Sequence, residues 1–271
     1  MYCFIPSEPD IIAYVDREKP KRTLALAKQA GAVVMQGFNQ LLWPPVCFNC
    51  RQSICETDKD LCGNCWTQLL ACTGADYCRR CGRDADRAAQ LEGTCPDCQG
   101  KTIHFDAIAR AGIYAQSLQK MIVAFKNGKT ELDSILGFLA DSALQGSGFC
   151  NDMDFLVPVP LHWSRRLRRG YNQSSILIKK LKRPTAQVST DLVRIRRTKT
   201  QPTMTSPRAR ARNVAGAFAV RNRHSFTGRN ICLVDDIKTT GATLNECAKT
   251  LKNAGAAKVF ALVLAVAGQK M

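Results

Sequence analysis

The sequence has no long hydrophobic run. No stretch of about 18 or more apolar residues occurs in the 271-residue chain, and the longest clean apolar run, residues 259–267, is the size of a strand. The sequence therefore predicts no transmembrane helix and no membrane insertion. The first 20 residues carry four acids and no apolar segment typical of a signal peptide, so we expect a cytoplasmic protein.

Histidine is also scarce. The chain has three, His104, His162 and His224, and none stands in a motif with a Ser or Cys nucleophile. This pattern argues against a hydrolase of the Ser-His-Asp or Cys-His kind. The overall composition, 45% hydrophobic and 23% charged, is that of a globular protein and excludes disordered, collagen-like and coiled-coil chains.

Acidic residues are few, and their scarcity is uneven. The chain has 39 Lys and Arg against 22 Asp and Glu, a formal net charge of +17. Between residues 162 and 223 lie 17 Lys and Arg and one acid, Asp191, so this basic window carries +16. Such a window predicts a polyanionic partner: phosphate, pyrophosphate or nucleic acid. The alternative is a solvated basic surface that keeps the chain soluble.

Three parts can be distinguished along the chain. Residues 1–46 are an N-terminal extension with a predicted helix over 23–42, residues 47–100 hold most of the cysteines, and residues 101–271 alternate strands and helices. Within the last part we expect one strand and two helices over 104–150. The strands expected after that are residues 155–160, 231–234 and 259–266, with a helix over 242–254. This alternation predicts an α/β fold with a parallel sheet.

The cysteines fall into four C-x-x-C pairs, and this spacing indicates metal binding. Two such pairs form a closed tetrahedral site for a structural zinc ion, so eight cysteines predict two zinc ions. The simplest pairing is sequential, and a cross-braced arrangement stays open, as does the alternative of buried thiols or disulfides. The eight candidate ligands are Cys47, Cys50, Cys62, Cys65, Cys78, Cys81, Cys95 and Cys98.

Residues 231–243 carry the most informative motif. A hydrophobic strand is expected to end in Asp235 and Asp236, and a Thr-Thr-Gly-Ala-Thr turn, residues 239–243, then opens a helix. Backbone N–H groups at a helix N-terminus bind phosphate, and Gly241 lets the backbone approach closely. The carboxylates suit sugar hydroxyls or a Mg²⁺ ion. The alternative is an acidic turn that caps a helix. Lys238 either adds charge to the loop or points to solvent.

Two basic segments flank the predicted site. Residues 157–173 run from a strand into a turn with four arginines and Gly170, and arginine suits phosphate oxygens. Residues 194–218 have seven basic residues and no acid, which favours a mobile loop that closes over an anionic ligand. Gln201, Arg210 and Asn213 are its candidate polar contacts. For both segments the alternative is a plain basic surface.

Together these motifs, in this order, resemble the ComF family, also called GntX, of double-zinc-ribbon proteins with a type I phosphoribosyltransferase domain. The resemblance covers residues 41–268 and includes Lys126-Asn127-Gly128, where Asn127 departs from the family's aromatic residue. It implies a ligand, 5-phosphoribosyl-1-pyrophosphate (PRPP), with Mg²⁺. It also implies a hood over 101–150 and a core over 151–271.

The resemblance implies a role for each matching residue. Asp235 and Asp236 hold the ribose 2′ and 3′ hydroxyls, and Arg169, Gly170 and Tyr171 face the pyrophosphate; the two acids and Arg169 are the candidate catalytic residues. The residues of the 5-phosphate loop are Lys238, Thr239, Thr240, Gly241, Ala242 and Thr243.

We therefore expect a Mg²⁺-dependent, PRPP-binding competence protein that takes part in the uptake or handling of single-stranded DNA. Single-stranded DNA and other competence proteins are the expected partners, and the oligomeric state stays open. One alternative is a true phosphoribosyltransferase of nucleotide metabolism. The other is a regulator that binds PRPP without turnover. The acceptor of any transfer is not evident from the sequence.

Overall fold

The computed structural model describes residues 45–54, 60–74, 76–85, 95–182, 185–198, 206–221 and 226–268. The helix expected over 23–42 lies outside these residues. The described residues from 63 onward form one compact unit with residues 48–50, and the other described residues before 63 belong to a separate unit. Within these ranges, no helix combines the length and the apolar character needed to span a membrane.

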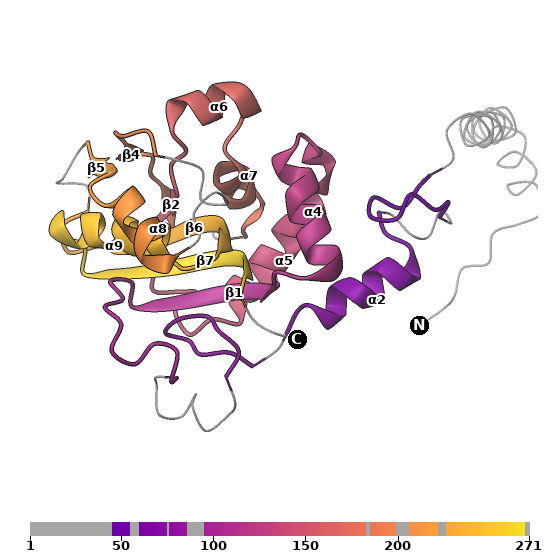
Figure 1. The fold of residues 1–271 in the computed structure, drawn as a ribbon, viewed down its shortest axis with the longest axis horizontal. Coiled ribbons are helices and arrows are strands. Elements are labelled where there is room, and N and C mark those ends of the chain that lie inside the picture. The colour runs from indigo at the N-terminus through magenta and orange to yellow at the C-terminus, as the bar shows by residue number, and fades with distance from the viewer. Residues whose placement is uncertain are drawn as a thin grey trace, which may run out of the picture. The chain divides into compact units, whose positions relative to one another are not determined.

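A five-stranded parallel sheet organises the larger unit, in the order β1-β7-β6-β2-β3 (Figure 1). A short antiparallel ladder, β4-β5, stands apart from it. The predicted parallel α/β fold is confirmed. The strands are β1 Ala107–Ile113, β2 Phe155–Pro158, β3 Gln187–Val188, β4 Leu192–Arg194, β5 Phe218–Val220, β6 Asn230–Lys238 and β7 Lys258–Val266.

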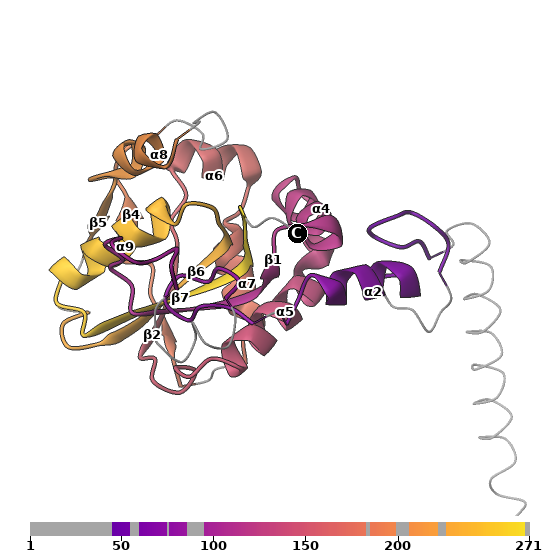
Figure 2. The same cartoon turned by 60° about the horizontal axis from the view of Figure 1, so that its bottom comes forward.

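Helices cover both faces of the sheet. Helices α5 and α7 pack on one face and α9 on the other (Figure 1, Figure 2). Strand β7, paired on both sides, is buried throughout after its first residue, which explains its unbroken apolar sequence. The helices are α2 Gly63–Ala71, α4 Gln116–Lys126, the 3₁₀ turn η1 Thr130–Leu132, α5 Asp133–Gln145, α6 Trp163–Arg169, α7 Gln173–Lys180, α8 Pro207–Val214 and α9 Ala242–Asn253.

Two segments expected to lack regular structure contain helices. The arginine-rich turn after β2 is helix α6, which begins where the His162 ring accepts a hydrogen bond from the Ser164 amide and ends at Gly170. The second is α8, inside the segment expected to be a mobile loop. Its N-cap, Ser206, accepts a hydrogen bond from the Ala209 amide, and proline occupies the first helical position. Local capping therefore outweighs the weak apolar periodicity.

The second cysteine cluster is docked on the sheet by an arginine clamp. Arg80 donates hydrogen bonds to the carbonyls of Ile103, Phe105 and Asp106, at 2.8, 2.7 and 2.9 Å. These carbonyls belong to the segment that enters β1. A Cβ atom on Gly82 would lie 3.2 Å from side chains of β1 and β7, so the cysteine loop packs directly on the sheet.

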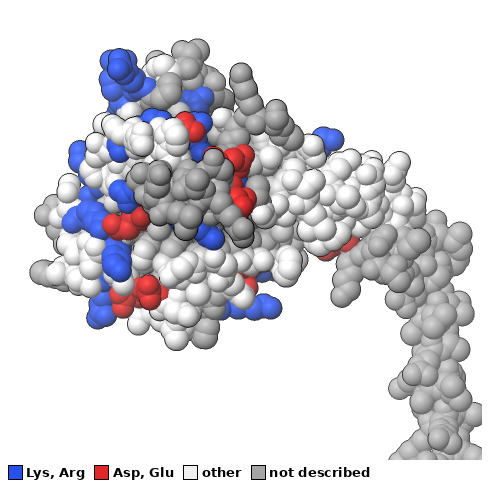
Figure 3. Space-filling view, turned by 90° about the horizontal axis from the view of Figure 1, so that it is seen from below, with Lys and Arg blue, Asp and Glu red and all other residues white. Residues whose placement is uncertain are grey.

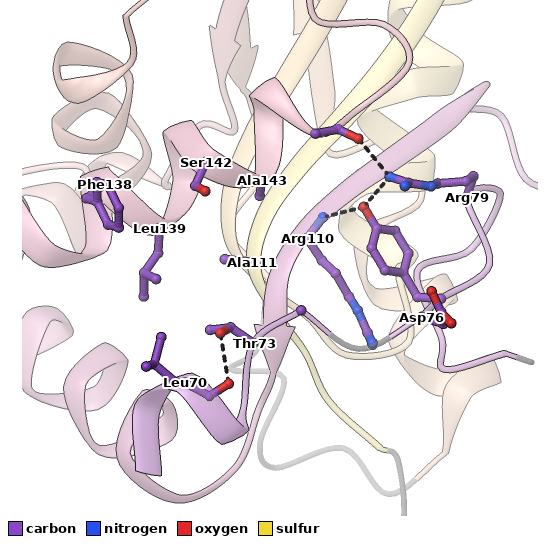
Figure 4. A pocket seen from close by; sticks show the side chains of 13 residues that line it. Leu70, Thr73, Asp76, Arg79, Arg110, Ala111, Phe138, Leu139, Ser142 and Ala143 are labelled. Carbon is purple, nitrogen blue, oxygen red and sulfur yellow. Dashed lines mark hydrogen bonds between the residues drawn. The ribbon is translucent and has the colours of Figure 1, made fainter. Parts of the chain in front are cut away.

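A stack of charged and aromatic side chains adds to this contact (Figure 4). The Arg79 and Arg110 guanidinium carbons lie 4.7 and 4.8 Å from the Tyr77 ring centre, within cation–π range. Arg110 is buried in β1, pairs with Asp84 and donates to the Gly82 carbonyl at 2.9 Å. Tyr77, Arg79 and Arg110 border an open cavity of about 350 Å³. The second cysteine cluster thus forms a small buried cluster of its own that packs on the sheet of the larger unit.

Gly112 of β1 provides a test of a neighbouring contact, between β1 and the segment that follows α2. A Cβ atom there would lie 2.2 Å from the Cys72 carbonyl oxygen, which accepts a hydrogen bond from the Ile113 amide. We expect Gly112→Ala to lower the free energy of unfolding by about 2–4 kcal/mol, because backbone must move. Gly148→Ala is the matched control, since a Cβ there meets no atom within 4 Å. Equal denaturant midpoints for the two variants would contradict the packing described.

Candidate functional site

The acid pair, Asp235 and Asp236, lies inside strand β6. The expected end of this strand at Val234 is wrong, because β6 continues in register with β7 until Lys238 pairs with Val266. Asp236 is buried and Asp235 is half-buried. Backbone pairing therefore fixes both carboxylates at the carboxyl end of the sheet, the edge where open parallel sheets bind ligands.

Positive charge reaches the acid pair from two directions. The Lys126 ammonium, at the end of α4, lies 3.0 Å from the Asp236 carboxylate. Burial and the charge of Asp236 raise the pKa of Asp235 to about 7, while Lys126 and Arg194 partly oppose the rise. The pair therefore needs nearby cations to remain ionised, and one of its members can exchange a proton near neutral pH.

Sequence reasoning assigned neither of these cations to the acid pair. For Lys126 the available signal was the Lys126-Asn127-Gly128 segment, whose departure from the family pattern weakened the comparison. Arg194 was one of seven basic residues in a segment expected to be a loop. In the structure it ends β4, and its guanidinium carbon lies 5.3 Å from the ring centre of Phe218 on β5. In the folded chain Arg194 acts on Asp235, which distinguishes it from the other basic residues of this segment.

The turn after α6 meets the end of α4. The Tyr171 hydroxyl donates a hydrogen bond to the Phe125 carbonyl, and their ring centres lie 6.1 Å apart. Gly170 adopts φ = +79° as it ends the helix, a conformation that favours glycine. Arg169 donates to the Gln173 side-chain oxygen at 3.3 Å. Tyr171 therefore connects the arginine turn to the helix that carries Lys126.

Residues 239–243, the Thr-Gly loop, join β6 to α9. Gly241 is the N-cap of α9, with φ = +82°. Because glycine has no side chain, it supplies no capping group. Its carbonyl accepts from the Asn245 amide at 2.8 Å, and the Thr240 hydroxyl lies 3.4 Å from the Ala242 amide nitrogen. The first-turn N–H groups of α9 face the loop, and an N-terminus built in this way attracts anions.

Lys238 is buried. Neither of the two alternatives, a charge added to the loop or a side chain that points to solvent, describes it fully. Only 6% of the residue is exposed, and burial lowers the pKa of its ammonium. A Cβ atom on Gly241 would lie 3.0 Å from the Lys238 Cε, so the Thr-Gly loop rests on the lysine side chain. The solvent-facing orientation is therefore wrong.

The other candidate polar residues lie on or near α8. Arg210 and Asn213 are on this helix, whereas Gln201 lies outside the described residues. The Gly216 amide, just after α8, donates to the Glu246 carboxylate of α9 at 2.8 Å. Helix α8 is therefore anchored to the helix that follows the Thr-Gly loop.

The eight C-x-x-C cysteines form two groups of four in the sequential pairing. Within each group the sulfur atoms lie within 4.8 Å of one another. In the second group, Cys78 and Cys98 sulfurs are 3.9 Å apart and Cys81 and Cys95 sulfurs 3.4 Å. Tetrahedral zinc with bonds of about 2.3 Å requires sulfur separations of about 3.8 Å, whereas a disulfide requires about 2 Å. The donor set fits zinc.

Comparison with known proteins agrees with this arrangement. A double zinc ribbon domain model matches residues 38–99, and a phosphoribosyl transferase domain model matches residues 167–270. Competence protein F of Haemophilus influenzae is 30% identical over 220 residues, or 79% of this chain and 93% of that protein. The chain belongs to the ComF family. It carries the two structural Cys₄ zinc sites of a double zinc ribbon and a phosphoribosyltransferase-type domain.

Other ComF relatives match over similar lengths. The DNA utilization protein YhgH of Escherichia coli is 31% identical over 80% of this chain and 94% of its own. Competence protein ComFC of Bacillus subtilis is 30% identical over 74% of this chain and 82% of its own. Among solved structures, an allosteric regulatory enzyme of purine biosynthesis aligns with a TM-score of 0.32 at 19% identity, over 49% of this chain and 26% of that one.

The raised pKa of Asp235 predicts a pH-dependent effect on stability. Its folded-state pKa, about 7, lies above the ordinary value near 4, so its ionisation destabilises the fold as the pH rises between these values. Asn resembles the protonated acid. Relative to the unmodified chain, Asp235→Asn should gain about 1–3 kcal/mol of stability between pH 5 and pH 8, an amount reduced for partial exposure.

Chemical denaturation at the two pH values, with zinc present, measures this gain. Asp152→Asn, which removes an exposed carboxylate, is the matched control and should show no comparable change. A gain for Asp235→Asn that is constant or shrinks as the pH rises would contradict the electrostatic description of the pair.

Proposed function

We propose that this chain is a Mg²⁺-dependent PRPP-binding protein of the ComF family that handles single-stranded DNA in the cytoplasm. The observation that carries the PRPP part is the sequence of β6, the Thr-Gly loop and α9. Within nine residues, 235–243, it combines two carboxylates on a rigid strand with a helix N-terminus whose N-cap residue, Gly241, has no side chain. A phosphorylated sugar has a diol that matches the carboxylates and a phosphate that matches the helix N-terminus.

Each part of the site then has a role. The Thr-Gly loop holds the 5-phosphate through backbone N–H groups, and Asp235 and Asp236 accept hydrogen bonds from the ribose hydroxyls. Arg169, the last residue of α6 just before the turn fixed by Tyr171, faces the pyrophosphate. Carboxylates and phosphates are the oxygen ligands that Mg²⁺ prefers, and the ion would offset the charge of the pyrophosphate. Ligand binding must compete with the Lys126–Asp236 ion pair.

Transfer of the phosphoribosyl group from PRPP to an acceptor is a more specific alternative. In that reaction the bond from ribose C1 to pyrophosphate breaks as a bond to an acceptor nitrogen forms, and basic groups stabilise the departing pyrophosphate. Lys126, which pairs with Asp236, and Arg169, which the family resemblance assigns to the pyrophosphate, are the candidates for this role. The hood, residues 101–150, contributes α4 and would select the acceptor. Without an acceptor, the same site would serve a regulator that binds PRPP and does not turn it over.

Calorimetric titration of PRPP, with Mg²⁺ and then with EDTA, tests this assignment. We expect binding only with Mg²⁺. The double variant Asp235→Asn, Asp236→Asn should weaken it about 100-fold or more, because several charge-assisted hydrogen bonds are lost. The matched control is Glu131→Gln, an exposed acid of the hood, which should bind normally.

The outcomes separate the alternatives. Unchanged affinity in the double variant would overturn the assignment of the acid pair. Pyrophosphate release on addition of a nitrogen acceptor would identify a transferase, and binding without release across acceptor classes would identify a regulator.

A second observation favours the DNA-handling part. Helix α6 exposes Trp163 and Leu167, at 66% and 75%, on a helix that also carries four arginines and no acid. An exposed aromatic ring amid positive charge suits a single strand, because bases stack while the backbone is neutralised. On the face in Figure 3, Lys and Arg are interspersed with Asp and Glu, so that face is not a continuous basic surface. The names of the YhgH and competence relatives agree with this role.

Binding of a fluorescent single-stranded oligonucleotide at different salt concentrations tests this part. Affinity should fall steeply between about 50 and 200 mM salt, because many cations contact phosphates. Trp163→Ala should weaken binding by about 5-fold to 100-fold through lost stacking. Trp66→Ala, on α2 and 38% exposed, is the matched control. Salt-independent binding, or equal affinity of the two variants, would contradict this role.

A further inference from the structure

Lys238 is a buried cation that the site described above does not use. It is the last residue of β6, and its carbonyl accepts a hydrogen bond from the Ala267 amide at 2.8 Å, so its backbone is held by the sheet. Among the residues that the structure describes, its ammonium forms no hydrogen bond or ion pair, although the residue is 94% buried at 6% exposure. A buried ammonium needs compensating negative charge.

Lys238 lines a small cavity together with residues from two other parts of the chain. This cavity, about 190 Å³ in volume, is lined by Cys81 of the second zinc ribbon and by Thr240 and Gly241 of the Thr-Gly loop. Arg83, Asp97 and Lys101 complete its charged lining. The cavity therefore joins a structural metal site to the predicted phosphate loop.

The charges around this cavity favour one partner for Lys238. Arg83 and Asp97 already pair with each other at 3.4 Å, and Lys101 is exposed to water. Four thiolates with one Zn²⁺ carry two net negative charges, and all four cysteines of the second ribbon are buried. Zinc-bound sulfur accepts hydrogen bonds, and a lysine has three donors. A phosphate in the cavity would instead face both the zinc–thiolate group and Asp97.

We propose that Lys238 is the counter-charge of the second zinc site and, through its side chain beneath Gly241, the residue that positions the Thr-Gly loop. The aliphatic part of Lys238 supports the loop, as shown by the 3.0 Å separation between its Cε and a Cβ built on Gly241. When zinc leaves, the ammonium loses its partner and the support under the loop changes. Zinc binding and phosphate binding are then coupled, and the coupling is reciprocal.

Zinc release from the full-length chain tests the counter-charge without reference to any sugar phosphate. A chromogenic chelator should detect two zinc equivalents. In Lys238→Met, which keeps the length and apolar stem of the side chain, one equivalent should leave about tenfold faster or more. Lys101→Met is the matched control, because it removes an exposed cation that lines the same cavity. A Cys50→Ser background, which disables the first site, assigns the faster phase to the second.

A second measurement uses the unmodified chain and does not depend on the folding of the variant. Acylation of lysines, followed by mass spectrometry, should show Lys238 protected while zinc is bound and reactive after chelation, with Lys101 reactive in both states. Equal zinc-release rates for Lys238→Met and Lys101→Met would overturn the proposal. Equal acylation of Lys238 with zinc bound and after chelation would overturn it as well.

The effect on the loop rests on the proposed function and has a separate readout. Saturating PRPP with Mg²⁺ should slow zinc release from the unmodified second site and should not slow it in Lys238→Met. If PRPP does not bind at all, the proposed function fails while the zinc-release result still decides the counter-charge. If PRPP binds and zinc release is unaffected in the unmodified chain, the positioning role fails.

Discussion

Two adjacent carboxylates on a buried strand cannot both stay ionised without positive charge close by, and this constraint organises the site. Asp235 and Asp236 are fixed in β6 by pairing with β7, so the cations must come to them. Lys126 arrives from α4 and Arg194 from β4, while Tyr171 holds the arginine turn to the end of α4. Elements from distant parts of the sequence therefore meet at the end of one strand.

The second zinc ribbon is likewise joined to the sheet by contacts between separate parts of the chain. Its Arg80 binds the chain entering β1, and Arg110 of β1 binds the Gly82 carbonyl and Asp84 of the ribbon. A loop of about 25 residues with little apolar surface cannot fold alone, and zinc supplies the missing free energy. Because the loop packs on β1 and β7, that free energy also stabilises the edge of the sheet. A closed Cys₄ site can thus affect the functional site without any open coordination position.

The sequence predicts those features that local patterns determine. The apolar run of β7, the amphipathic helix α9 and the four C-x-x-C pairs each identify their element or ligand set. The features it missed depend on partners elsewhere in the chain. Strand β6 extends past its acids because its backbone pairs with β7 as far as Lys238 and Val266. Lys126 reaches Asp236 because α4 comes directly after β1 in the chain, and β1 pairs with β7, the neighbour of β6. Helix α8 was missed for another reason, since the Ser206 cap and Pro207 were local signals within a segment judged by its charge.

The electrostatic state of the acid pair links stability to ligand binding. A folded-state pKa near 7 for Asp235 means that the fold holds a carboxyl group whose ionisation is unfavourable at neutral pH. In the proposed function, hydrogen bonds from a diol, or a cation brought with a pyrophosphate, would stabilise the ionised form and remove part of this cost. The proposed ligand would then gain affinity from charge that destabilises the protein without it. The same argument would apply to the proposed pairing of Lys238 with the second zinc site, since Lys238, Cys81 and the Thr-Gly loop line one cavity.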